Sequence, residues 1–268
     1  MNRAVLITGA HTGTGYAIAE LFAKQGWDVF ITSRNGEKAA ASACVLSDTY
    51  GVFAKGYECN IGNEQQVKDI FSDIDASGRF VETLVLNAAN LGFGKDPAKG
   101  LDFFTMDVAE FREVFETNLV WNFTIVRQAA QRMQAHHKGA VVFISSNTAY
   151  RAIPNRAAYC ASKGGINALS KALAIDLGCY GIRCNVVLPG TIKTERWHTM
   201  GNSRIVDGEF TPIGDISDFE DIANAVWYLG TDASKNVTGT EIHVDGGMSC
   251  QLYPQLLNTL KRQVLQNG

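Results

Sequence analysis

The chain has no excess of charge of one sign: 24 Lys and Arg residues face 27 Asp and Glu residues, which leaves a net charge of −3 over 268 residues. Because no basic stripe is present to neutralise phosphates, we expect no nucleic-acid partner. Long apolar runs are missing as well, and stretches such as Ala140–Ile144 are far too short to cross a bilayer. We therefore expect no membrane partner.

Cysteine and histidine are few and irregularly spaced. The six cysteines include no C-x-x-C pair and the five histidines lack metal-type spacing, so we expect no metal site. The apolar residues Ala4–Ile7 follow Met1-Asn2-Arg3 without the length of a signal-peptide core or a small-residue cleavage site. The sequence thus predicts free thiols in a reducing compartment and a soluble, cytoplasmic protein.

Strand-like and helix-like patterns alternate along the chain. The apolar run Val5–Thr8 ends in a glycine-rich turn, and Gly15–Gln25 has apolar residues at helical spacing. Further strands are expected at Trp27–Thr32, Val52–Glu58, Thr83–Leu86, Ala140–Ile144, Ile182–Leu188 and Thr240–Val244. Further helices are expected at Gly36–Thr49, Asn63–Ala76, Asp107–Met133, Ala157–Leu177 and Asp218–Leu229.

Nearly continuous apolar strands with helical crossovers predict an α/β fold: a doubly wound, Rossmann-type parallel sheet of about seven strands, with helices on both faces. No repeat or linker interrupts the chain, so residues 1–268 are predicted to form a single domain. Two stretches, Asn90–Met106 and Thr191–Gly214, lack periodicity and follow strand ends, where open parallel sheets bind ligands. They are either substrate loops or long surface connections.

The first predicted strand and helix are joined by Thr8–Gly15, which reads Thr-Gly-Ala-His-Thr-Gly-Thr-Gly. Glycines let the backbone approach a ligand, and the start of the following helix presents free N–H groups that suit a pyrophosphate. The turn is not a Walker A loop, and Ile18 stands where a G-x-G-x-x-G fingerprint needs glycine. A dinucleotide site and a plain tight turn both fit this segment.

The end of the second predicted strand, Thr32–Asn35, has no carboxylate to bind the ribose hydroxyls of NAD. The small Ser33 leaves room for a 2′-phosphate, and Arg34 supplies a fork-shaped cation to bind it. This pair favours NADP(H) over NAD(H). The alternative is an exposed loop arginine.

Tyr159 and Lys163 start a predicted helix, and their i, i+4 spacing sets them on one face about 6 Å apart along the axis. Ser145 and Ser146 end the preceding strand at the same sheet edge. A lysine cation about 4 Å from a phenol, at a dielectric of 20, contributes on the order of 4 kcal/mol, or about 3 pKa units. We therefore expect Lys163 to lower the pKa of Tyr159 toward neutrality, as a general acid–base needs.

With these motifs, the chain resembles a classical short-chain dehydrogenase/reductase from Val5 to about Ser249. The residues that carry the resemblance, besides the glycine turn and Tyr159/Lys163, are Asn87-Ala88, Asn118-Leu119, Ser145-Ser146, Pro189-Gly190 with Thr194, Thr238-Gly239 and Val244-Asp245-Gly246-Gly247. It implies that Tyr159 is the general acid–base, that Lys163 also holds the nicotinamide ribose, and that Ser146 binds the reacting oxygen. Asn118 would anchor a water in a proton relay to Lys163.

The resemblance also implies a cofactor site. Its members are Gly9, His11, Thr12, Gly13, Thr14, Gly15, Ser33, Arg34, Asn60, Ile61, Asn87, Ala88, Tyr159, Lys163, Pro189, Gly190, Ile192 and Thr194. Four positions depart from the family pattern. Leu86 and Ala89 are the first and last residues of the usual Asn-Asn-Ala-Gly motif, here Leu-Asn-Ala-Ala, and Asn60 replaces an acidic residue that contacts adenine. Thr12 stands where many NADP(H)-dependent members carry a basic residue, so that position does not support NADP(H).

For the substrate, Ile182–Ile192, Glu220–Val226 and Tyr253-Pro254 are similar to bacterial hydroxysteroid dehydrogenases. Residues that could line an apolar cleft are Phe93, Phe103, Phe104, Trp197 and Met200. We expect interconversion of a secondary alcohol and a ketone on a steroid or bile-acid-like substrate, bound by Ser146, Tyr159 and Trp197. Open alternatives are reduction of a β-ketoacyl, sugar-derived or other small carbonyl, and a non-catalytic dinucleotide-binding regulator. The aromatics would then pack in the core or at a subunit interface.

The C-terminal tail, residues 249–268, follows the last predicted strand. Leu256, Leu257, Leu260 and Val264 fall at helical spacing. An amphipathic helix here could cover the substrate cleft, dock on another subunit or fray at the surface. The family resemblance implies a homotetramer.

Overall fold

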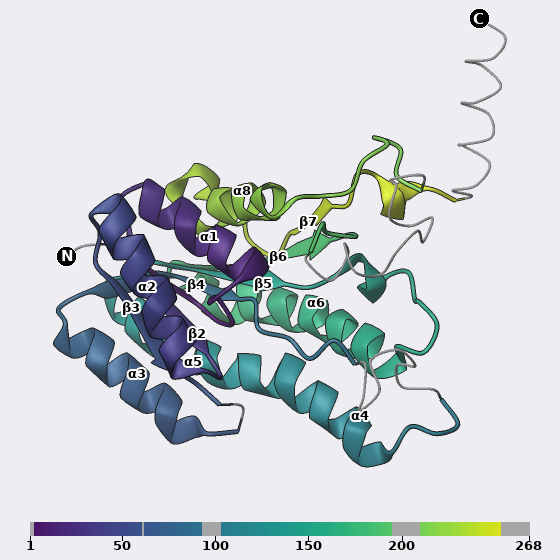
Figure 1. Cartoon of the computed structure of the whole chain (residues 1–268), viewed down its shortest axis with the longest axis horizontal. Coiled ribbons are helices and arrows are strands. Elements are labelled where there is room, and N and C mark those ends of the chain that lie inside the picture. Colours follow the sequence, from purple (N-terminus) through teal and green to yellow (C-terminus); the bar gives the residue numbers. More distant parts are fainter. Residues whose placement is uncertain (1–2, 61, 93–102, 195–209, 253–268) are drawn as a thin grey trace, which may run out of the picture.

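The computed structural model describes residues 3–60, 62–92, 103–194 and 210–252. Its strands form one seven-stranded sheet in the order β3-β2-β1-β4-β5-β6-β7, with every neighbouring pair parallel (Figure 1). The strands are β1 (Arg3–Ile7), β2 (Asp28–Ser33), β3 (Ala54–Glu58), β4 (Phe80–Leu86), β5 (Gly139–Ile144), β6 (Ile182–Pro189) and β7 (Glu241–Val244).

Helices cover both faces of this sheet. They are α1 (Gly13–Lys24), α2 (Gly36–Tyr50), α3 (Glu64–Ala76), α4 (Val108–Phe115), α5 (Trp121–His136), α6 (Ala157–Gly178) and α8 (Phe219–Gly230). Helices α1, α2 and α8 cover one face, and α3, α5 and α6 cover the other (Figure 1). The side chains of each group pack in a separate apolar cluster. The predicted doubly wound α/β fold is therefore confirmed.

The central strands are buried on both sides, as their unbroken apolar sequences predict. In β1, Val5 and Ile7 belong to the cluster under α1 and α8, whereas Leu6 belongs to the cluster under α5 and α6. All three are at most 1% exposed. Burial of each such side chain contributes roughly 1.5–3 kcal/mol, so the two-sided core fixes the sheet register.

The strand order reverses beside β1, because β2 and β3 lie on one side of β1 and the next strand, β4, lies on its other side. In open parallel sheets, the carboxyl ends of two such strands flank a crevice that binds ligands. The loops after β1, β4, β5 and β6 all emerge at this edge, so the fold brings the predicted site segments together.

The predicted long helical region, Asp107–Met133, is confirmed. It consists of α4 and α5 joined by a π-helical segment, Glu116–Val120, that the sequence did not predict. The segment contains neither proline nor glycine, so hydrophobic periodicity gave no sign of it. Its centre is Asn118, whose side chain is held by hydrogen bonds to another loop. Such bulges often occur at functional sites.

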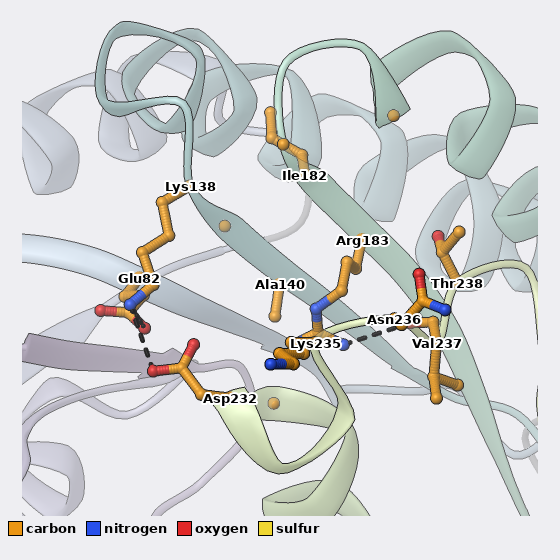
Figure 2. Close-up of a pocket in the computed structure, with 14 residues that line it drawn as sticks. Glu82, Lys138, Ala140, Ile182, Arg183, Asp232, Lys235, Asn236, Val237 and Thr238 are labelled. Carbon is orange, nitrogen blue, oxygen red and sulfur yellow. Dashed lines mark hydrogen bonds and ion pairs between the residues drawn. The ribbon is translucent and has the colours of Figure 1, made fainter.

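At the opposite edge of the sheet, a cavity of about 330 Å³ holds a cluster of charges. Lys138 Nζ lies 3.0 Å from a carboxylate oxygen of Glu82 and 3.3 Å from one of Asp232. Figure 2 shows these three side chains pointing toward one another. Because the chain neutralises these charges itself, we assign the cluster a structural role. It explains why β4 extends back through Glu82 to Phe80, three residues before the predicted start of that strand at Thr83.

Candidate active site

The glycine turn and the loop after β4 are tied together by hydrogen bonds. Asn87 donates through Nδ2 to the carbonyls of Thr8, at 3.1 Å, and Gly9, at 2.9 Å. The Thr8 hydroxyl in turn accepts from the backbone N–H groups of Asn87 and Ala88, each at 3.0 Å. These contacts hold the floor of the crevice where the sheet order reverses.

Space inside the turn admits only glycine at two positions. A Cβ on Gly15 would lie 2.6 Å from both the Asn87 amide nitrogen and the Gly9 carbonyl oxygen. A Cβ on Gly9 would lie 3.0 Å from Ala88, and Gly9 also has a φ of +63°. Close packing against the chain's own backbone therefore requires glycine at both positions.

The start of α1 has no side-chain cap. Thr12 is the N-cap residue, but its side chain accepts no hydrogen bond from the first turn. In contrast, Asn35 and Asn63 cap α2 and α3 through their side chains. The N–H groups of residues 13–15 are thus available to an anion, as a pyrophosphate requires. The residues fit a dinucleotide.

The end of β2 offers room and a cation. Ser33 is buried, and its hydroxyl lies 3.0 Å from His11 Nδ1 and accepts from the Asn35 N–H at 3.1 Å. Arg34 is exposed, and within the described ranges no side chain pairs with its guanidinium. Nearby, Asn60 donates to Glu58 at 2.6 Å. The predicted cofactor residue Ile61 lies outside the described residues.

The far side of the crevice comes from the segment after β6. Pro189 ends this strand, and the Gly190 N–H donates to the Val244 carbonyl at 3.0 Å. A Cβ on Gly190 would lie 2.6 Å from that of Asp245, so this position also requires glycine. Ile192 then forms a parallel bridge with Ser217. The predicted cofactor residue Thr194 ends this described segment.

Ser146, Tyr159 and Lys163 come together at the carboxyl end of β5. Ser146 is the N-cap residue of a short 3₁₀ helix, Asn147–Ala149, and its hydroxyl accepts from the Thr148 N–H at 3.1 Å. Tyr159 and Lys163 lie on the first turns of α6. The Lys163 Nζ is 5.6 Å from the centre of the Tyr159 ring. It donates to the Ile144 carbonyl at 2.8 Å.

Burial dominates the electrostatics of this pair. It raises the pKa of Tyr159 to about 12, against the opposing effects of a hydrogen bond from Ser146 and the positive charge of Arg156. It lowers the pKa of Lys163, which is 2% exposed, to about 7. The expected lowering of the Tyr159 pKa by Lys163 is therefore wrong for the chain alone. The Lys163 side chain points to the Ile144 carbonyl, and with a pKa of about 7 it loses its proton readily at neutral pH. The Tyr159 phenol is protonated at neutral pH.

Asn118 connects three parts of the site. Its side chain accepts from the Asn90 N–H at 2.7 Å and donates to the Asn90 carbonyl at 2.9 Å and to Ser162 Oγ at 3.0 Å. Its own carbonyl accepts from Asn122 Nδ2 at 2.7 Å. Asn118 thus ties the loop after β4 to α6 and positions the helix that carries Tyr159. The water relay to Lys163 stays a prediction.

A cleft of about 560 Å³ opens beside Tyr159. It is lined by Leu91, Ser146, Asn147, Thr148, Arg151, Ala152, Ile153, Arg156, Tyr159, Gly190, Thr191, Phe210 and Met248. The expectation that Phe103 and Phe104 line the cleft is wrong, because they are 76% and 91% exposed and pack against each other at the surface. The other predicted lining residues, Phe93, Trp197 and Met200, lie outside the described residues, as does the tail from Tyr253 to Gly268.

The sequence interpretation missed the arginines of the cleft, Arg151 and Arg156. A signal was available for Arg156, because a residue three positions before Tyr159 lies one helical turn away. In the described ranges, no group of three or more His, Cys, Asp or Glu residues is arranged to hold a metal ion. No helix in that part of the chain is long and apolar enough to cross a membrane.

Comparison with known proteins agrees with this geometry. A family model described as enoyl-(acyl carrier protein) reductase matches residues 9–249. A 3-oxoacyl-(acyl carrier protein) reductase of Rickettsia felis is 35% identical over 246 residues, which cover 91% of this chain and 95% of the relative.

Two solved structures superpose closely. A 3-oxoacyl-(acyl carrier protein) reductase from Brucella melitensis has a TM-score of 0.82 and 28% identity, covering 92% of this chain and 91% of that one. A gluconate 5-dehydrogenase from Burkholderia cenocepacia J2315, in complex with NADP and tartrate, has a TM-score of 0.84 and 26% identity, covering 94% and 96%. On this evidence, the chain belongs to the classical short-chain dehydrogenase/reductase family of oxidoreductases.

Proposed function

We propose that this oxidoreductase reduces a 3-oxoacyl thioester to the 3-hydroxyacyl thioester, with NADPH as the reductant. The observation that carries the proposal is the protonated Tyr159 phenol beside Ser146 at one end of a largely apolar cleft. The names of the Rickettsia and Brucella relatives support a 3-oxoacyl substrate and favour this alternative over a steroid. The surface position of Phe103 and Phe104 also removes part of the argument for a steroid.

In this proposal, NADPH supplies the hydride when it is bound. Ser146 donates a hydrogen bond to the carbonyl oxygen of the substrate, and Tyr159 donates a proton to the same oxygen as the alcohol forms. Lys163, with a pKa of about 7, can pass a proton toward the phenol at neutral pH. Burial favours the neutral phenol in the chain alone, so Tyr159 carries the proton that reduction of a carbonyl requires.

The shape and lining of the cleft support an acyl chain. Leu91, Ile153, Phe210 and Met248 provide apolar contacts, and the volume of about 560 Å³ lies in the range of small-molecule sites. A polyol such as a sugar acid would leave many hydroxyl groups against these apolar side chains, at a cost for each unpaired group. The lining therefore favours an acyl thioester over a gluconate-type substrate.

For the cofactor, NADPH is proposed because Arg34 is exposed beside the small, buried Ser33 and has no partner in the described ranges. A 2′-phosphate would give that guanidinium an anionic ligand. The Burkholderia relative, solved with NADP, supports the same choice.

The test is loss of reduced-cofactor absorbance with acetoacetyl-coenzyme A, a 5-oxo sugar acid and a ketosteroid, using NADPH and NADH in parallel. We expect turnover of the thioester with NADPH at a kcat/KM at least tenfold above that of the other substrates. Preferential turnover of the ketosteroid or the sugar acid would refute the substrate proposal. Absence of turnover throughout would favour a non-catalytic dinucleotide-binding protein.

A further inference from the structure

The charged residues that line the substrate cleft are all cations in the described part of the chain. Arg151 and Arg156 line it, and no carboxylate does. Both arginines come from the segment between Ser146 and Tyr159, which the proposed reaction uses at its two ends. The cleft thus combines an apolar wall with two cationic side chains.

Arg156 lies close to the reacting end. It is the N-cap residue of α6, three positions before Tyr159, which corresponds to about 5 Å along a helix. Its Cδ would lie 4.0 Å, and the Tyr159 Cβ 3.2 Å, from a Cβ placed on Gly92, so the arginine stem and the tyrosine share one backbone neighbour. The positive charge also lowers the pKa of Tyr159, as expected for a guanidinium near the phenol.

Arg151 belongs to the same segment between Ser146 and Tyr159. Its backbone N–H donates to the Asn147 carbonyl at 3.1 Å, which fixes the start of the loop. Its side chain is exposed, and within the described ranges no carboxylate or carbonyl pairs with it. Lys138 in the opposite cavity differs, because Glu82 and Asp232 neutralise it (Figure 2). Within the described ranges, the charge of Arg151 is therefore left without an anionic partner.

We propose that the cleft selects a carbonyl substrate bearing an anionic oxyacid group, a carboxylate or a phosphate, and that Arg151 and Arg156 are the specificity-determining residues that bind it. This inference rests on the proposed function, in which a carbonyl is reduced at Tyr159. Planar guanidinium groups bind both oxyanions through paired N–H donors, so the two arginines fit either source. A phosphate would come from the arm of the thioester, and a carboxylate from the substrate acid itself.

Four substrates separate these sources. The first pair is acetoacetyl-coenzyme A, which carries phosphates, and acetoacetyl-N-acetylcysteamine, which has the same reacting group without charge. The second pair is 5-oxohexanoate, which carries a carboxylate, and its neutral methyl ester. Steady-state kcat/KM is measured for the wild type, Arg151→Gln, Arg156→Gln and Arg156→Lys. Arg127→Gln is the matched control, since it removes the same charge from the exposed side of α5, outside the cleft. Affinity for NADPH, measured by fluorescence, checks that each variant is folded.

We expect each cleft Arg→Gln variant to lose about 10- to 100-fold in kcat/KM on the anionic substrate and less than threefold on its neutral partner. Arg156→Lys should recover part of the loss, and 0.5 M salt should narrow the difference between charged and neutral substrates. If the variants lose kcat/KM only on the coenzyme A thioester, the group that the arginines bind is a phosphate. If they lose kcat/KM only on 5-oxohexanoate, that group is a carboxylate. Equal losses on charged and neutral substrates would overturn the inference.

Failure of the proposed function gives a different result. If the wild type reduces none of the four carbonyls, the reductase proposal is wrong, and binding then tests the arginines. The wild type should bind 3-hydroxybutyryl-coenzyme A or 5-oxohexanoate at least tenfold more tightly than Arg151→Gln does, measured by calorimetry. If the two proteins bind both anions with equal affinity, the proposed anion site is wrong, whether or not the protein turns over a carbonyl substrate.

Discussion

Replacement of Lys163 by methionine should change stability in a strongly pH-dependent way. Burial lowers the pKa of Lys163 from 10.5 to about 7, so a charged lysine at this position costs about 5 kcal/mol of folding free energy at low pH. Lys163→Met removes that cost. It also removes the donor of the 2.8 Å hydrogen bond to the Ile144 carbonyl, a loss of about 1–3 kcal/mol at every pH.

The direction follows from proton binding. Because the folded-state pKa is lowered, the folded chain binds fewer protons than the unfolded chain between pH 7 and 10.5. The cost of burying Lys163 is therefore complete below pH 7 and vanishes above pH 10.5. Lys163→Met should be more stable than the wild type by about 2–4 kcal/mol at pH 6 and less stable by about 1–3 kcal/mol near pH 10.5.

Urea unfolding of both proteins at pH 6, 8 and 10, without cofactor, measures this difference. Lys171→Met is a matched control on the same helix. Its side chain is exposed, and a hydrogen bond to Glu241 raises its pKa, so its loss should not stabilise the chain at pH 6. A Lys163→Met effect that stays constant from pH 6 to 10 would show that burial does not control the protonation of this lysine.

Two further predictions concern the cofactor. Gly15→Ala should cost about 1–3 kcal/mol of stability and weaken NADPH binding at least tenfold, because its Cβ would lie 2.6 Å from Asn87 Nδ2 and the Gly9 carbonyl. Thermal unfolding and fluorescence titration measure both, and Gly178→Ala, with no atom within 4 Å of the new Cβ, should change neither. Arg34→Gln should lower kcat/KM for NADPH about 10- to 100-fold and leave that for NADH within twofold, whereas Lys24→Gln should affect neither cofactor. An equal loss of kcat/KM with both cofactors would show that Arg34 does not bind the 2′-phosphate.

The sheet was predictable because its strands are apolar on both faces. Runs such as Val5–Ile7 and Ala140–Ile144 have no polar face, and helical segments separate the strands, which leaves few arrangements other than a parallel sheet. The errors in the predicted strands lie at the ends of the elements. The start of β4 was missed because Glu82 breaks the apolar run, and its burial depends on ion pairs with distant residues.

The segments of the candidate site were predictable because each follows a strand. Tyr159 and Lys163 have a fixed spacing on one helix, and Ser146 ends the preceding strand. The protonation states were not predictable from spacing. They depend on burial and on the direction of the Lys163 side chain toward the Ile144 carbonyl, which only the folded chain defines.

The lining of the cleft was the least predictable part. Aromatic residues were expected there because they are apolar, but Phe103 and Phe104 lie at the surface. Arg151 and Arg156 appeared in no motif, since their place beside Tyr159 results from the path of the loop after Ser146. A specificity loop of this kind is built from tertiary contacts, which hydrophobic periodicity does not record.

The central claim is that Tyr159 donates the proton in an NADPH-dependent reduction of a 3-oxoacyl thioester. The most direct test compares kcat for acetoacetyl-coenzyme A in the wild type and Tyr159→Phe, with the NADPH dissociation constant measured for both. We expect kcat to fall about 10²- to 10⁴-fold while NADPH affinity stays within threefold. Full activity of the Tyr159→Phe variant would show that Tyr159 is not the proton donor.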